Sequence, residues 1–142
     1  MIEVYAPASI GNFAVGFDAL GAALAPIDGT LLGDVVAVSS ASADEFICSG
    51  DYAHKLPTDA SENLAYQCLV HFREHVAPNM PTVKLELKKN LPIGSGLGSS
   101  ACSVVATFAA LDKFADTKLS QVALIELMAD FEAIVSGGRH YD

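Results

Sequence analysis

The segment from residue 92 to 102 constrains this fold more than any other, because it joins a strand pattern to a helix pattern. Residues 83–88 alternate apolar and charged side chains, which predicts a half-buried strand. Residues 99–114 are apolar on nearly every side, which predicts a buried helix. The sequence must therefore turn sharply between a strand and a helix. The connecting residues, in order, are Pro92, Ile93, Gly94, Ser95, Gly96, Leu97, Gly98, Ser99, Ser100, Ala101 and Cys102.

This glycine-rich loop has the composition of a phosphate-binding loop. Glycine lets bare backbone approach a ligand and accepts positive φ, and the helix behind it offers unpaired N–H groups and a positive dipole end. It is not a Walker A motif, because no lysine follows Gly98, and Ser99 stands where the dinucleotide fingerprint needs its last glycine. A tight structural turn, with Ser99 or Ser100 as a simple helix cap, remains the alternative.

Composition narrows the classes of partner. The 142 residues are 51% hydrophobic and carry a net charge of −9, which predicts one domain with a sizeable core. Residues 1–54 contain no Lys or Arg, so we expect no nucleic-acid partner. The three cysteines show no metal-like pairing, the N-terminus does not resemble a signal peptide, and no apolar run is long enough to span a membrane. We therefore expect a cytoplasmic protein without membrane contact.

The remaining pattern predicts a mixture of strands and helices. Strands are expected over 2–6, 33–39 and 45–49, and helices over 65–76 and 119–135. Asp59 and Glu62 have the spacing of a capping box before the first of these helices.

Glu132 is the candidate metal ligand. On the predicted helix it lies within about 40° of Ile125 and Met128, near the apolar side. It is either a boundary residue whose head reaches water or, beside a phosphate loop, a ligand that holds Mg²⁺ together with the Ser100 hydroxyl. Lys88 and Lys89 are interpreted as solvated edge charges. Backbone amides, the helix dipole and Mg²⁺ would then neutralise most of a bound triphosphate.

Four blocks of this sequence together resemble the GHMP small-molecule kinases, a family named for galacto-, homoserine, mevalonate and phosphomevalonate kinases. The loop 92–102 is similar to the family's phosphate loop. The first motif, in its homoserine kinase form, is matched by residues 6–12 and 16–21, which contain small and polar residues and no basic residue. The last block comprises Glu132, Ser136, Gly137, His140, Tyr141 and Asp142.

The resemblance implies an α+β fold, a mixed β-sheet with helices on one side, and an ATP- and Mg²⁺-dependent phosphorylation of the side-chain hydroxyl of L-homoserine on the route to threonine. Residues 92–102 would wrap the triphosphate of ATP. Ser100 and Glu132 would hold Mg²⁺ and serve catalysis. Asn63 would contact adenine, and the L-homoserine site would include Asn12, Asp18 and His140.

The resemblance also implies that residues 1–142 are an N-terminal ATP-binding domain that ends inside the active-site segment. A second, ferredoxin-like domain would be missing, so we expect the isolated chain to be inactive and the full-length enzyme to be a homodimer. Three alternatives remain: a kinase for another small alcohol, a non-catalytic nucleotide-binding module, and a structural or interaction domain.

Overall fold

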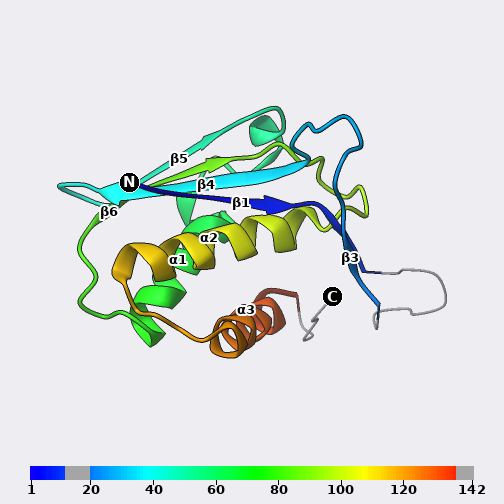
Figure 1. Ribbon diagram of the computed structural model, residues 1–142. Helices are drawn as coiled ribbons and strands as arrows, with labels where there is room; N and C mark the ends of the chain where they lie inside the picture. The colour runs from blue at the N-terminus through cyan, green and yellow to red at the C-terminus, as the bar shows by residue number, and fades with distance from the viewer. Residues whose placement is uncertain (12–19, 137–142) are drawn as a thin grey trace.

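A four-stranded mixed sheet forms one layer of the protein (Figure 1). The computed structural model describes residues 1–11 and 20–136. The strand order in the sheet is β1, β4, β6, β5; β5 runs parallel to β6, and the other neighbours are antiparallel. Their bounds are β1 Ile2–Pro7, β4 Gly33–Ser40, β5 Glu45–Ser49 and β6 Val83–Lys88. A separate short ribbon pairs β2 (Ser9–Ile10) with β3 (Ala22–Ala23).

The helices lie on one face of this sheet. Helix α2 (Ser99–Ala115) packs on β1 and β4, and α1 (Leu64–His75) packs beside α2. Helix α3 (Gln121–Ser136) contacts α2 on the side away from the sheet, so the layers run from sheet to α1 and α2 and then to α3 (Figure 1). Two short 3₁₀ turns, Ala53–Lys55 and Ala60–Glu62, precede α1. This is the mixed α+β architecture, with helices on one side of the sheet, that the resemblance to the GHMP kinases implies.

The hydrophobic core lies between the sheet and the helices α1 and α2. Strand β6 points Val83, Leu85 and Leu87 inward, as the alternation predicts, and α2 is buried along most of its length. Burying a large aliphatic or aromatic side chain contributes about 1.5–3 kcal/mol, so this layer is a major source of stability. The largest fully buried apolar side chains are Phe72, Phe108, Leu69, Leu85, Leu87, Leu91, Leu111, Val36, Val38, Val83 and Val104.

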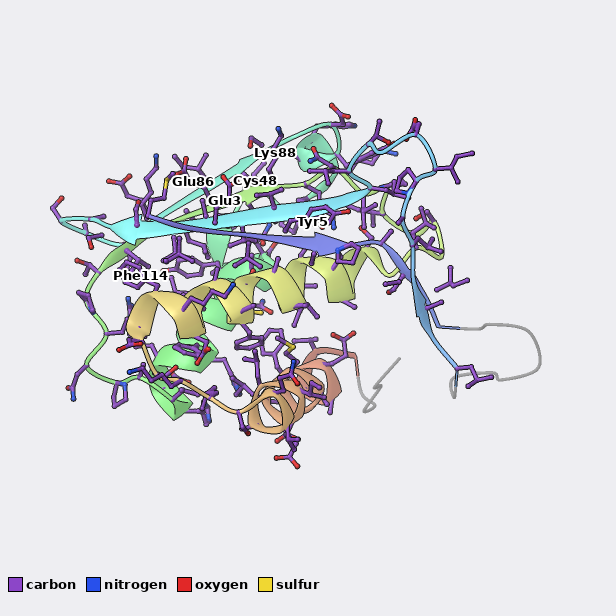
Figure 2. The ribbon with its side chains drawn as sticks, in the orientation of Figure 1. Glu3, Tyr5, Cys48, Glu86, Lys88 and Phe114 are labelled. Atoms are coloured by element: carbon purple, nitrogen blue, oxygen red, sulfur yellow. The ribbon has the colours of Figure 1, made fainter. Side chains whose placement is uncertain are left out.

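The other face of the sheet carries polar and charged side chains. Figure 2 shows Glu3, Glu86 and Lys88 on the face that points away from the helices, in agreement with the burial pattern of β1 and β6. Lys84 pairs with Glu86 along β6 at 3.0 Å, which is a partly exposed contact of small energetic value. Within residues 1–11 and 20–136, the helices therefore cover one face of the sheet.

An ion pair anchors the beginning of β6. Both terminal nitrogens of Arg73 on α1 donate to the carboxylate of Asp44, at 2.5 and 3.0 Å, and Asp44 Oδ1 also accepts from the backbone N–H of Val83 at 2.8 Å. The hydrogen bond from Arg73 holds the pKa of Asp44 below its usual value. This pair joins α1 to the start of the strand that leads into the glycine loop.

The predicted elements are confirmed to within a few residues, but the cap of the first helix was assigned wrongly. Asp59 caps the 3₁₀ turn Ala60–Glu62, accepting from Ser61 N, and α1 begins one residue after Asn63, whose side chain accepts from Ala65 N at 3.0 Å. An aspartate and an asparagine four residues apart can each cap a turn, and only the three-dimensional path decides between them. Within the described ranges, no helix has the length and apolarity that a membrane crossing requires.

Candidate functional site

A cavity of about 500 Å³ lies where the glycine loop, the start of α2 and one face of α3 meet. The loop follows β6 at the end of the sheet where the β2–β3 ribbon lies (Figure 1). Three segments that are distant in sequence, residues 9–11, 94–105 and 125–132, therefore contribute to one site. Among the described residues, the lining consists of Ser9, Gly11, Gly94, Ser95, Gly96, Gly98, Ser99, Ser100, Ala101, Val104, Val105, Ile125, Met128, Ala129 and Glu132.

The loop glycines adopt backbone conformations that other residues avoid. Gly94, Gly96 and Gly98 have φ of 72°, 76° and 64°, all in the left-handed region. The Ser95 hydroxyl donates to Pro92 O at 2.8 Å, and Ser9 N donates to Leu97 O at 3.1 Å, so the loop is braced internally and against the β2 segment. The loop is thus a defined turn whose glycines border the cavity.

The N-terminal end of α2 opens onto the same cavity. Gly98 is the N-cap residue and makes no side-chain cap, so the helix geometry leaves the first N–H groups without an intrahelical acceptor. Ser99 is buried and its hydroxyl lies 3.3 Å from Leu91 O, whereas Ser100 is exposed and lines the cavity. Because the positive end of the dipole is here as well, this corner suits an anion.

Glu132 borders the cavity from α3, and Ser100 borders it from the start of α2. A carboxylate and a hydroxyl are oxygen ligands of the kind that Mg²⁺ prefers, together with phosphate oxygens and water. None of the described lining residues is a lysine or an arginine. Charge neutralisation of an anionic ligand at these walls would rest on amides, the helix dipole and a divalent cation.

Lys89 does not lie where the sequence interpretation placed it. Its side chain is 2% exposed, and its ammonium donates to Asp34 Oδ2 at 2.5 Å, to Ser99 O at 2.6 Å and to Ser103 Oγ at 2.9 Å. The expectation of a solvated edge charge was wrong for Lys89 because Asp34, on β4, supplies a buried counter-charge. Lys88 is exposed, as expected.

Asn63, the candidate adenine contact, does not line the cavity as far as the described residues define it. It is 2% exposed, and its Oδ1 caps α1. Its Nδ2 is buried without a hydrogen-bond partner in the protein. Leaving such a donor unpaired inside the protein costs free energy.

The other candidate residues divide into two groups. Within the loop, Pro92, Ile93, Leu97 and Cys102 do not line the cavity. Cys102 lies behind it: the thiol donates to Ala6 O at 3.0 Å and accepts from Asp34 N at 3.2 Å, and burial raises its pKa to about 11. The candidates Asn12, Asp18 and His140 lie outside the described residues.

Sequence reasoning missed the apolar wall of the cavity. It is formed by Val104 and Val105 of α2 and by Ile125, Met128 and Ala129 of α3. Helical spacing places Val104 on the face of Ser100, and Ile125, Met128 and Ala129 on the face of Glu132, and this was the available signal. What spacing cannot show is that α2 and α3 meet at this point.

Replacing Gly98 by alanine is expected to destabilise the protein more than replacing Gly94 by alanine. A left-handed conformation costs a non-glycine residue roughly 1–2 kcal/mol, and this cost applies at both positions. At Gly98 a Cβ would also lie 2.4 Å from Ser9 Oγ, whereas at Gly94 it would meet no atom within 4 Å. We use the term parent protein for the longest natural protein that contains this chain. Thermal unfolding of the parent protein measures the loss of stability in each variant. Equal losses would contradict the predicted clash with Ser9.

Comparison with known proteins places this geometry in a family. The family model described as "GHMP kinases N terminal domain" matches residues 63–142. A homoserine kinase from Cytophaga hutchinsonii is 30% identical with a TM-score of 0.79; the match covers 98% of this chain and 43% of that chain. A Methanococcus jannaschii mevalonate kinase shows the same fold. It is 18% identical with a TM-score of 0.71, and the match covers 97% of this chain and 48% of that chain. A Streptococcus pneumoniae phosphomevalonate kinase solved with phosphomevalonate and AMPPNP also shows this fold. It is 20% identical with a TM-score of 0.72, and the match covers 97% of this chain and 44% of that chain.

The chain thus spans less than half the length of these kinases. The matching family model covers more than half of this chain, including the glycine loop, α2 and Glu132. The glycine loop lies inside the segment that the family model matches. The chain belongs to the GHMP kinase family.

Proposed function

We propose that the parent protein is a kinase that transfers the γ-phosphoryl group of ATP to the side-chain hydroxyl of L-homoserine. The observation that carries the proposal is that the glycine loop, the N-terminal end of α2 and Glu132 border one cavity. Phosphoryl transfer needs positioning and charge stabilisation more than it needs a covalent catalyst. Loop amides, a helix dipole and a site for a divalent cation meet that need.

The residues present fit MgATP. The left-handed glycines at 94, 96 and 98 bring backbone to the cavity wall, and the N–H groups that open α2 would donate to a bound anion. Ser100 and Glu132 would hold Mg²⁺, which when bound supplies charge stabilisation to the transferring phosphoryl group. The proposed adenine contact is the Nδ2 of Asn63, which is buried outside the cavity lining and would have to be uncovered to donate to adenine. ATP and Mg²⁺ are therefore the cofactors proposed for this site.

The choice of L-homoserine rests on the similarity to the Cytophaga homoserine kinase, which extends over 98% of this chain. In this proposal Asn12, Asp18 and His140 bind the amino acid, with Asp18 facing its ammonium or hydroxyl group. The mevalonate and phosphomevalonate kinases are similar in fold, and a related small alcohol is the competing substrate class. A homodimeric, cytoplasmic enzyme belongs to the same proposal.

The test is a coupled ADP-release assay of the parent protein with MgATP and L-homoserine, L-threonine or mevalonate. We expect kcat/KM for L-homoserine to exceed that for either competitor by about tenfold or more, since misplacing the reacting hydroxyl removes transition-state contacts. Removal of Mg²⁺ by EDTA should abolish turnover, and added Mg²⁺ should restore it. Turnover of mevalonate without L-homoserine would reassign the substrate, and turnover of none of the three would overturn the proposal.

A further inference from the structure

Asp34 and Lys89 form a buried ion pair in which every hydrogen-bonding position is used. Asp34 Oδ1 accepts from the N–H groups of Asn90 and Leu91 at 2.9 and 3.0 Å. Its Oδ2 accepts from the Lys89 ammonium at 2.5 Å and from the Ser103 hydroxyl at 2.8 Å. Lys89 directs its three donors at Asp34, Ser99 O and Ser103 Oγ. Both charges are therefore satisfied within the protein.

The partners of this pair lie at the two ends of the glycine loop. Asn90 and Leu91 immediately precede it, and Ser99 and Ser103 belong to the first turns of α2, where its last residues are helical. A single carboxylate on β4 thus holds the start of the loop directly and its end through Lys89 and Ser103. Residues 92–98 span a fixed distance between these anchors.

The pair lies behind the loop and outside the cavity. Neither Asp34 nor Lys89 lines the cavity, and their side chains are 0% and 2% exposed. Lys89 therefore has no contact with the space assigned to the triphosphate, although its place in the sequence, just before the loop, would suit a phosphate-binding lysine. The charge of Lys89 is directed at Asp34 and at a backbone carbonyl instead.

We propose that Asp34 and Lys89 are positioning residues, which fix the two ends of the loop so that its amides face a nucleotide phosphate. The identity of the ligand in this inference rests on the proposed function. The expected effect of the ion pair on the loop conformation does not depend on that function. Loss of the pair should loosen the loop without uncovering the core. It should raise KM for MgATP more than it lowers kcat, because residues that bind the acceptor are untouched.

The test replaces the pair by apolar residues of similar size, Asp34→Leu with Lys89→Met, so that no unpaired charge is left buried. The matched control is Asp44→Leu with Arg73→Met, which removes the ion pair at the other end of β6. Hydrogen exchange of residues 93–101 in the nucleotide-free parent protein is the first readout. KM and kcat for MgATP are the second.

We expect the loop amides to exchange about tenfold faster or more in the Asp34–Lys89 variant, while amides of β4 and β6 keep their protection. KM for MgATP should rise by about tenfold, and the control should change neither readout. Ser103→Ala, which keeps the ion pair and removes one hydroxyl, should shift both in the same direction by less. If the double replacement does not fold, the Ser103→Ala variant tests the positioning role by itself.

Unchanged loop exchange with unchanged KM would overturn the positioning role. So would equal effects in the control variant, because they would show a general loss of stability. If the unmodified parent protein bound no nucleotide, the proposed function would be wrong. The exchange measurement on the loop would still confirm or contradict the role of the pair.

Discussion

Replacing Lys89 by methionine is expected to lower the free energy of unfolding by about 3–5 kcal/mol, because the change strands the Asp34 carboxylate inside the protein. Asp34 is fully buried, and its Oδ2 would keep only the Ser103 hydroxyl as a partner. Hydrogen exchange of amides in β4, β6 and α2 of the parent protein measures the loss, since these elements surround the pair.

The neighbouring residue supplies the control for this prediction. Lys88→Met removes an ammonium from the exposed face of the same strand, where Figure 2 shows it directed away from the helices. Its effect should stay within about 0.5 kcal/mol. Adding Asp34→Leu to Lys89→Met should recover much of the lost stability, because it removes the stranded charge. A double variant less stable than Lys89→Met would contradict this explanation.

Replacing Glu132 by glutamine in the parent protein is expected to reduce kcat by about 10²-fold or more, which corresponds to roughly 3 kcal/mol of transition-state stabilisation. The substitution keeps the size of the side chain and removes the negative charge that would hold Mg²⁺ at the cavity. Initial rates at saturating MgATP and L-homoserine measure the effect. Titration of the residual rate with Mg²⁺ shows whether metal affinity is lost at the same time.

Glu126→Gln is the matched control, because it makes the same chemical change on an exposed residue of the same helix. It should leave kcat and the Mg²⁺ dependence unchanged. The pair of variants also separates a kinase from a non-catalytic nucleotide-binding module. In a module, Glu132→Gln would weaken nucleotide binding with no turnover to lose.

Much of the fold could be predicted from periodicity. Strand β5 is found at the residues expected, 45–49, and β6 at 83–88, because each is short and bounded by turn residues. The helices differ from prediction by a few residues at their ends, where caps compete, as at Asp59 and Asn63. The parallel pairing of β5 with β6 could not be predicted, because alternation along one strand does not identify its neighbour.

The candidate site was predictable where function depends on local backbone. Glycines at alternate positions before an apolar helix indicate positive φ at those glycines and a helix N-terminus without a side-chain cap. The structure has both features. The environment of Lys89 was not predictable, because Asp34 lies 55 residues earlier in the chain. Nothing local to either residue indicates that both are buried. The same limit applies to the apolar wall, which requires α2 and α3 to pack together.

Strand β4 forms hydrogen bonds with both β1 and β6, and it also carries Asp34. Pairing of the central strands and anchoring of the glycine loop should therefore occur in a fixed order during folding. Residues 33–40 and 83–88 must close a long chain loop before they pair, which is a slow, non-local step. The segment between β6 and α2 gains its carboxylate anchor only when that step is complete. In refolding experiments, the ability to capture a nucleotide should therefore emerge together with central sheet pairing, however early α2 becomes helical.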